Sequence, residues 1–355
     1  MSYLFTPLWL RDLESRNRIF VSPMCQYSSW EGFPSDWHLV HLGSRAVGGA
    51  GLVMMEATAV VPEGRISPMD MGLWSDEHAR ALERIPRFIL TQGAIPGIQI
   101  SHAGRKASVS PPFHGGRAVP PQDGGWEVRA PSDVAFGPGF ALPRPFEAAE
   151  IELLPEQFAA AARRALDAGF EVIEIHAAHG YLLHQFLSPL SNRRDDQYGG
   201  SFDARVRVPL AVTRAVRGAW PERLPVLVRL SATDWVEGGW TLDDSIALAR
   251  RLRQEGVDLV DCSSGGLVPG AKIPTAPGYQ VPFSAAIKRE AAVATAAVGL
   301  ITSPEQAEQI VATGQADAVM MARELLRNPY WPLVAARRLG AQASWPPQYE
   351  RARPR

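Results

Sequence analysis

Short runs of apolar and β-branched residues recur along the whole chain. They lack a strict alternation of apolar and polar positions, which is typical of strands buried on both faces of a parallel sheet. Eight runs of this kind predict strands at residues 19–22, 52–57, 95–100, 171–176, 226–231, 258–263, 296–301 and 318–322.

The segments between these runs carry apolar residues at helical spacing. Residues 155–168, for example, place Phe158, Ala161 and Ala165 on one face of a predicted helix. A glycine directly before the next strand permits the left-handed conformation that ends a helix. Four predicted helices end in this way, at Gly93, Gly169, Gly256 and Gly314.

Two further helices are predicted from their first residues. Thr241 is a suitable N-cap for a helix over residues 241–254, whose first turn is acidic. Ser303 is predicted to be the N-cap of another helix, followed by a proline at the first helical position and by Gln306 as a capping-box partner.

Eight alternating strand and helix units predict a closed (β/α)₈ TIM barrel, formed as one domain by residues 1–355. An open doubly wound sheet is the alternative. Its dinucleotide-binding version requires G-x-G-x-x-G after a strand, and the chain has no such motif. The barrel is therefore the better prediction.

One connection is much longer than the others. Residues 108–146, which follow the third strand, contain eight prolines and six glycines. Such a stretch is too long and too rich in helix breakers for a plain loop. We predict a lid-like insertion, with a disordered segment as the alternative.

The composition excludes several classes of protein. The chain has 36 basic and 37 acidic residues, and this near-neutral charge argues against nucleic-acid binding, which requires a basic surface. No apolar run approaches the roughly 20 residues of a membrane span, and residues 1–7 do not resemble a signal peptide. Cys25 and Cys262 are the only cysteines, which fits a cytoplasmic protein without disulfides.

Polar residues gather where the predicted strands end. In this fold the chemistry lies at the carboxyl ends of the strands, which all open onto one face. The residues expected there are Ser22, Cys25, Tyr27, Glu56, Gln99, His102, Arg105, Lys106, His176, His179, Tyr181, Arg229, Ser263, Gly299 and Arg323.

Gly299 and Arg323 follow the seventh and eighth strands, whose loops form the usual phosphate site of this fold. A glycine lets backbone amides approach an anion, and an arginine offers two parallel hydrogen bonds to a phosphate. A tight turn and an ordinary ion pair are the alternatives for these two residues. Their combination favours a phosphorylated ligand.

His176, His179 and Tyr181 lie together after the fourth strand. A metal site is one hypothesis, but neighbouring strand ends carry Gln99 and arginines rather than carboxylates, so we predict no metal. Two imidazoles that bind a carbonyl oxygen, beside a tyrosine that supplies a proton, fit these residue types better. Core histidines bonded to the backbone remain the third hypothesis.

Several motifs in this order resemble the Old Yellow Enzyme family of flavin-dependent ene-reductases, specifically its bacterial thermophilic-like branch, which includes xenobiotic reductases. The resemblance covers essentially the whole chain. The motifs are Ser22-Pro23-Met24-Cys25-Gln26-Tyr27, Glu56-Ala57-Thr58, Gln99-Ile100-Ser101-His102, His176-Ala177-Ala178-His179-Gly180-Tyr181, Asp196-Gln197-Tyr198-Gly199-Gly200 and Arg323-Glu324-Leu325.

The resemblance implies bound FMN, NADPH or NADH as the reductant and an activated alkene as the small-molecule substrate. Arg229 would lie beside N1 and the C2 carbonyl of the flavin, where a fixed cation stabilises negative charge. Ala322 stands where the family often has glycine. The flavin-binding residues implied are Ser22, Pro23, Met24, Cys25, Ala57, Gln99, Arg229, Gly299, Ala322 and Arg323.

The resemblance also assigns the substrate side. His176 and His179 would bind the carbonyl or nitro oxygen, Tyr181 would protonate the alkene, and Tyr27 would close the pocket. Arg351, within a tail of residues 340–355, would reach the site of a neighbouring protomer, which implies a homodimer or a larger homo-oligomer. A metal-dependent barrel hydrolase and a non-catalytic flavin-binding protein remain the alternatives.

Overall fold

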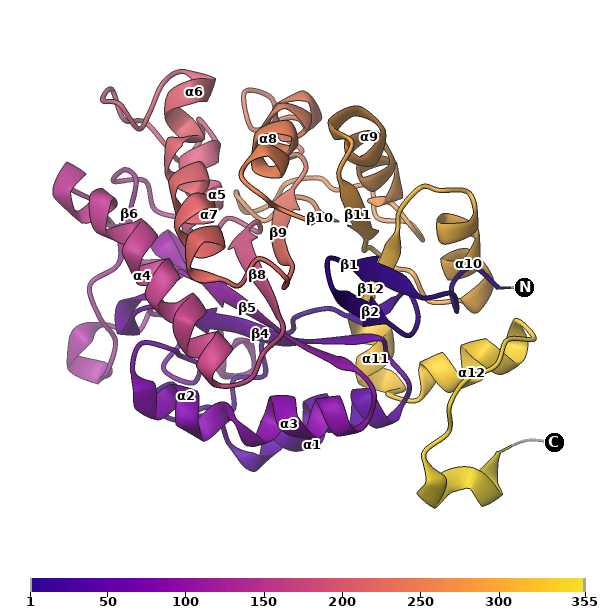
Figure 1. Ribbon diagram of the computed structural model, residues 1–355. Coiled ribbons are helices and arrows are strands. Elements are labelled where there is room, and N and C mark those ends of the chain that lie inside the picture. Colours follow the sequence, from indigo (N-terminus) through magenta and orange to yellow (C-terminus); the bar gives the residue numbers. More distant parts are fainter. Residues whose placement is uncertain (1, 354–355) are drawn as a thin grey trace.

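The computed structural model describes residues 2–353, which fold into a closed barrel of eight parallel strands (Figure 1). The strands follow one another around the barrel in the order β10-β11-β12-β3-β4-β5-β8-β9. The predicted (β/α)₈ barrel is confirmed. The barrel strands are β3 (Ile19–Val21), β4 (Leu52–Ala59), β5 (Ile95–Ser101), β8 (Val172–Ala177), β9 (Val226–Ser231), β10 (Leu259–Ser263), β11 (Ala294–Ala297) and β12 (Ala318–Met321).

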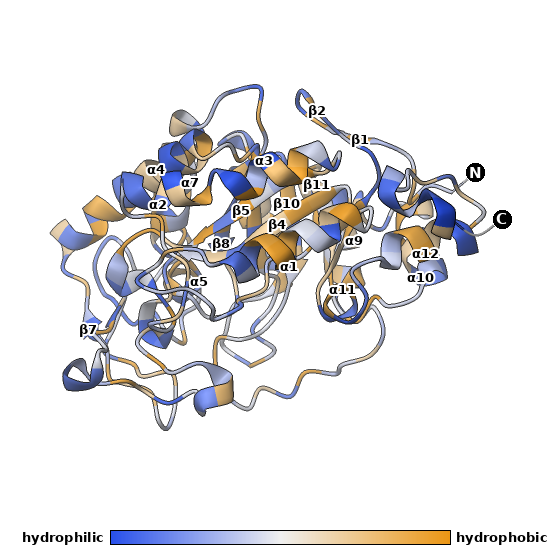
Figure 2. Cartoon of the chain, turned by 90° about the horizontal axis from the view of Figure 1, so that it is seen from below, coloured by the Kyte–Doolittle hydropathy of each residue, from blue (hydrophilic) through white to orange (hydrophobic). Residues whose placement is uncertain are grey.

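Helices surround the barrel, and Figure 2 shows hydrophobic strands at the centre with hydrophilic residues on the outer helices. None of the helices in the described part of the chain is long and apolar enough to cross a bilayer. The helices are α1 (Asp36–Val47), α2 (Asp76–Leu82), α3 (Arg84–Thr91), α4 (Ala148–Asp167), α5 (Leu182–Leu187), α6 (Phe202–Arg205), α7 (Arg207–Ala219), α8 (Leu242–Gln254), α9 (Val281–Ala291), α10 (Pro304–Ala312), α11 (Arg323–Arg327) and α12 (Trp331–Arg338).

Two apolar cores hold the barrel together. The larger lies between the strands and the helices, and the smaller fills the barrel with side chains such as Phe20, Met54 and Leu227. Leu10, from the antiparallel pair β1 (Leu8–Leu10) and β2 (Leu13–Ser15), packs into the smaller core beside residues at the starts of the barrel strands. The amino ends of the strands are therefore plugged, which leaves the carboxyl ends for a binding site.

Most predicted helix ends are confirmed. Gly93, Gly169, Gly256 and Gly314 all have positive φ angles, between 70° and 96°. The Thr241 and Ser303 hydroxyls accept hydrogen bonds from the amides of Asp244 and Gln306, both at 3.2 Å. The predicted reciprocal bond from the Ser303 amide to Gln306 is wrong, because the Gln306 side chain accepts from the amide of Thr302 instead.

Three predicted boundaries are wrong. Helix α4 begins at Ala148, ahead of the predicted start at residue 155, and contains Pro155 in its interior. Strand β11 spans Ala294–Ala297, because the positive φ angles of Gly299 and Leu300 end it before residue 301. Strand β4 continues to Ala59 through a bulge between Met55 and Ala57, so Glu56 does not end it.

The insertion after β5 is folded rather than disordered. It contains the short 3₁₀ helices η3 (Pro112–His114) and η4 (Pro121–Asp123) and the parallel pair β6 (Arg129–Ala130) and β7 (Arg144–Pro145). Arg129 and Arg144 both contact the Glu150 carboxylate, at 2.6 and 2.7 Å, which attaches the insertion to the start of α4. The remaining 3₁₀ segments are η1 (Pro62–Gly64), η2 (Gly104–Lys106) and η5 (Pro347–Ala352).

Candidate active site

A cavity of about 230 Å³ lies at the carboxyl ends of β10, β11 and β12. Gly299 and Arg323 line it together, as predicted from the strand ends, and Ala322 lies between β12 and the first residue of α11. Arg323 is exposed and makes no hydrogen bond to another described residue. Arg327 also lines the cavity but is paired with Glu324 at 2.5 Å. Among the described residues that line the cavity, Arg323 is thus the cation without an ion-pair partner.

Gly299 is required by the backbone at this place. Its φ angle is 123°, which residues with a side chain rarely adopt. A Cβ atom here would lie 2.9 Å from Nε2 of Gln280 and 3.1 Å from the Tyr279 ring. Because Gly299 has no side chain, the main chain itself forms this wall of the cavity.

Carboxylates inside the barrel hold Arg229 and Gln99 in place. The Arg229 Nε lies 3.1 Å from Asp261, and its Nη1 donates to the Ser22 hydroxyl at 2.9 Å. Gln99 Nε2 donates to Glu174 at 2.7 Å. Burial raises the pKa values of both carboxylic acids, and the charge of Arg229 opposes that rise. Ser22, Gln99 and Arg229 are thus polar side chains held by neighbouring groups inside the barrel.

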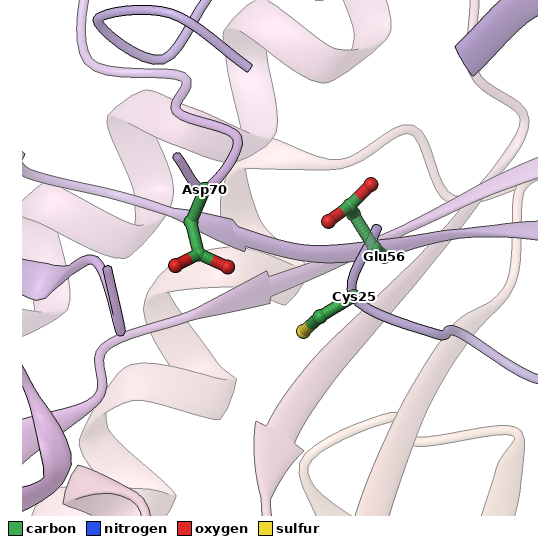
Figure 3. Close-up of side chains that lie close together, drawn as sticks. All are labelled: Cys25, Glu56 and Asp70. Carbon is green, nitrogen blue, oxygen red and sulfur yellow. The ribbon is translucent and has the colours of Figure 1, made fainter. Parts of the chain in front are cut away.

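Cys25, Glu56 and Asp70 form a second cluster, drawn in Figure 3, whose ligand atoms lie within 4.8 Å of one another. Glu56 accepts hydrogen bonds from the Gln26 amide at 2.8 Å and contacts His38 at 3.2 Å. Burial raises the pKa of the Cys25 thiol well above its usual range and that of Asp70 to about 7. Without a metal ion, this setting therefore favours the protonated thiol of Cys25.

His176 and His179 lie at the end of β8 and in the following turn. Their rings are nearly perpendicular, and His176 Nε2 is 3.4 Å from Nδ1 of His179. Burial, followed by the nearby charge of Arg229, lowers the pKa values of both imidazoles well below their usual range. Two neutral rings therefore lie next to each other at the barrel mouth.

Tyr181 stacks edge-on against His176, with ring centroids 4.9 Å apart. Burial raises the pKa of its hydroxyl well above the usual range, which keeps the proton on the oxygen. The three predicted catalytic residues thus share one corner of the mouth. Gly180 makes this possible, because a Cβ atom there would lie 2.3 Å from the carbonyl oxygen of Gly266.

The sequence places Lys106 at the barrel mouth, after the third strand, but does not predict its contact with this corner. Its ammonium lies 5.6 Å from the centre of the Tyr181 ring and donates to the carbonyl oxygen of His179 at 2.8 Å. Burial lowers its pKa to about 7. The basic pair that follows the third strand was the available signal, but its spacing alone does not show where the amine points.

The insertion covers this corner. Phe113 of η3 packs edge-on against Tyr27 at 6.0 Å, and Phe136 lies 4.1 Å from the Lys106 ammonium. Cys25, Tyr181 and Trp126 pack on the same small apolar cluster. The insertion therefore lies over the candidate site.

Arg351 does not join the site within one chain. It is exposed in η5, which packs on α12 through Tyr349 and Tyr330, 6.0 Å apart. Figure 1 shows this segment outside the barrel beside α12. The predicted tail continues through residues 354–355, which lie outside the described residues.

Comparison with known proteins gives the family. Residues 3–342 match the "NADH:flavin oxidoreductase / NADH oxidase family". The chain belongs to this family. It is 49% identical over 350 residues to an NADPH dehydrogenase from Geobacillus sp. (strain WCH70), covering 98% of each chain. It is 47% identical over 354 residues to an NADPH dehydrogenase from Listeria innocua serovar 6a, covering 99% of each.

A solved structure supports the same conclusion for this flavin oxidoreductase. Morphinone reductase is 27% identical, with a TM-score of 0.80, over 98% of this chain and 92% of that one. A second structure of morphinone reductase, in complex with tetrahydroNAD, has a TM-score of 0.79 over 97% of this chain and 93% of that one. The chain is thus an Old Yellow Enzyme-like oxidoreductase that works with FMN and a nicotinamide cofactor. The metal-dependent hydrolase and the non-catalytic binding protein are wrong.

The site of this flavin oxidoreductase fits FMN. The exposed Arg323 beside the cavity at Gly299 suits a phosphate, which needs a cation and close backbone. The buried Arg229 cation and the Gln99 amide, each held by a carboxylate inside the barrel, are groups that could bind the polar edge of a flavin ring. This donor set matches the cofactor that the family uses.

Proposed function

We propose that this protein is an ene-reductase that uses NADPH or NADH to reduce activated C=C bonds in enones, enals, maleimides or nitroalkenes. The main support is the corner where two neutral imidazoles and a protonated tyrosine hydroxyl lie together, with His176 packed edge-on against both other rings. Bound FMN would supply the hydride chemistry that links oxidation of the nicotinamide to reduction of the alkene in a ping-pong cycle. The names of the relatives favour NADPH.

Each of the three residues has its own task in this proposal. His176 and His179 bind the carbonyl or nitro oxygen and stabilise the charge that develops there. Tyr181 then delivers its proton to the other alkene carbon, which its raised pKa allows because the proton stays on the oxygen until needed. Tyr27, beneath Phe113, limits the size of the substrate pocket.

We also propose the residues that hold FMN. The four residues after β3 would line the ring system, and the cavity after β11 and β12 would take the phosphate. Their polar members already have supporting contacts from inside the barrel, as Arg229 and Gln99 show. The full set is Ser22, Pro23, Met24, Cys25, Ala57, Gln99, Arg229, Gly299, Ala322 and Arg323.

A homodimer or a larger homo-oligomer completes the proposal, with Arg351 entering the site of the neighbouring protomer. The exposure of Arg351 on η5, away from its own barrel mouth, supports this role in trans. Both cysteines are free, which supports a reducing cytoplasmic location. The substrate is a small molecule, with no role for nucleic acid or membrane.

Stopped-flow kinetics test the proposed activity. The FMN-loaded protein is reduced with NADPH without oxygen and then mixed with a panel of activated alkenes. We expect rapid reoxidation by at least one enone, maleimide or nitroalkene, with the saturated product formed in equal amount. Reoxidation by oxygen alone, and by none of the alkenes, would refute the proposal.

We predict that Arg323→Ala weakens FMN binding about 10- to 150-fold, because a hydrogen bond to a charged group contributes about 1.5–3 kcal/mol. Arg327→Ala is the matched control, since Arg327 lines the same cavity but is paired with Glu324. Fluorescence titration of the apoprotein with FMN measures both constants. Equal losses in the two variants would remove the special role of Arg323.

Cys25→Ala is expected to shift the flavin reduction potential without abolishing binding. The loss of one neutral hydrogen bond, about 0.5–1.5 kcal/mol, corresponds to roughly 10–30 mV for a two-electron couple. Cys262→Ala is the control, because its thiol donates to the Val260 carbonyl within the barrel wall. Spectroelectrochemical titration measures the potentials, and an unchanged value for Cys25→Ala would contradict its contact with the flavin.

A further inference from the structure

Ser263 links the cavity at Gly299 to the histidine pair. It is the buried last residue of β10, lines that cavity, and places its hydroxyl 2.6 Å from Nε2 of His179. The hydroxyl has no other hydrogen bond within residues 2–353. Among the described residues, the Ser263 hydroxyl is therefore the hydrogen-bond partner of Nε2 of His179.

The backbone of His179 is held from both sides. Its amide donates to the Ser231 hydroxyl at 2.9 Å, and its carbonyl accepts from Lys106 at 2.8 Å. Its φ angle of 57° is left-handed, which is rare for a residue with a side chain. With the main chain fixed in this way, the contact to Ser263 sets the direction of the ring.

The hydrogen bonds determine where the protons lie. His176 Nδ1 accepts from the amide of Ala178 at 3.2 Å, so a neutral His176 carries its proton on Nε2. That proton points at Nδ1 of His179, 3.4 Å away, which must then be an acceptor. His179 therefore carries its own proton on Nε2 and donates it to Ser263.

In this arrangement one N–H lies between the two rings, on Nε2 of His176, and a substrate oxygen could receive it only in place of Nδ1 of His179. The lone pair on Nδ1 of His179 would repel that oxygen, so a second donor requires the other tautomer of His179. A serine hydroxyl can accept a hydrogen bond or donate one by rotating about its C–O bond. It therefore suits both tautomers, whereas an alanine suits neither.

We propose that Ser263 is a positioning residue that lets His179 exchange tautomer when an oxyanion-like ligand binds. This inference rests on the proposed function of the histidine pair. Water takes the proton from Nε2 and supplies one to Nδ1, so the proton count of the ring does not change. Ser263 then donates to Nε2, and both histidines donate to the ligand oxygen.

NMR spectroscopy of ¹⁵N-histidine-labelled, FMN-loaded protein tests the exchange directly. Long-range ¹H–¹⁵N spectra are recorded with and without phenol, whose oxygen mimics the developing charge. We expect His179 to carry its proton on Nε2 in the free protein and on Nδ1 in the phenol complex. An unchanged tautomer of His179 in the complex would overturn the proposal, whether or not any alkene is reduced.

Substitution of the serine gives a second measurement. Ser263→Ala is expected to weaken phenol binding about 5- to 150-fold by calorimetry, because Nε2 then stays unpaired in a buried place. Ser263→Thr keeps the hydroxyl and should restore both the affinity and the tautomer change. Ser264→Ala is the matched control, since that hydroxyl donates to Gln280 instead. Wild-type affinity in Ser263→Ala, or no rescue by threonine, would contradict the role of the hydroxyl.

Discussion

Tyr181→Phe is expected to slow alkene reduction by roughly 10²–10⁴-fold, the usual contribution of a general acid. The phenol hydroxyl is the group removed, and the ring that packs against His176 at 4.9 Å remains. Reduction of the flavin by NADPH needs no proton from this residue, so its rate should change little. Rapid-mixing experiments on the two half-reactions measure both rates separately.

The control for Tyr181→Phe is Tyr198→Phe. Tyr198 is buried beside Arg194, outside the corner formed by the histidine pair, so the same chemical change there should leave both half-reactions nearly unaltered. Equal slowing of both half-reactions in Tyr181→Phe would indicate a structural role. In that case another group would donate the proton, and Lys106, whose ammonium lies 5.6 Å from the centre of the Tyr181 ring, is a candidate.

The cavity at Gly299 and Arg323 could be predicted from the sequence because barrel topology alone brings its parts together. Strands β11 and β12 are neighbours in the barrel, so residues that follow them meet at one edge. Gly299 and Arg323 line one cavity there. The predicted place of Gly299 was correct although the predicted end of β11, residue 301, was too late. The strand ends before Gly299, so the glycine still lies at the carboxyl end of the strand.

Other features of the site could not be predicted, because side-chain direction decides them. Asp70 lies in a loop before α2, and no periodic pattern indicates that its carboxyl group turns towards Cys25. The bulge at Glu56 displaces that residue from a regular strand register. Lys106 follows a strand at a basic pair, but only the folded loops show that its ammonium reaches the His179 carbonyl.

The proton positions of the histidine pair are a further case. The sequence predicts two imidazoles at one strand end, but the donor and acceptor roles follow from the Ala178 amide and from the contact between the two rings. Ser263 comes from β10, which is two places away from β8 in the barrel. Residue types and spacing therefore predict which groups are present. The folded structure is needed to tell which ring nitrogen donates and which accepts.

Replacing both imidazoles, in His176→Ala with His179→Ala, is expected to lower the rate of alkene reduction at least about 10²–10³-fold. That loss follows the removal of one donor from an oxyanion site, and both donors are lost here. Phenol affinity should fall with it, while FMN stays bound through the separate cavity at Gly299 and Arg323. The exposed His114→Ala is the matched control for loss of an imidazole. Calorimetry with phenol and stopped-flow reoxidation measure the two effects, and unaltered phenol affinity in the double variant would contradict the donor role of the pair.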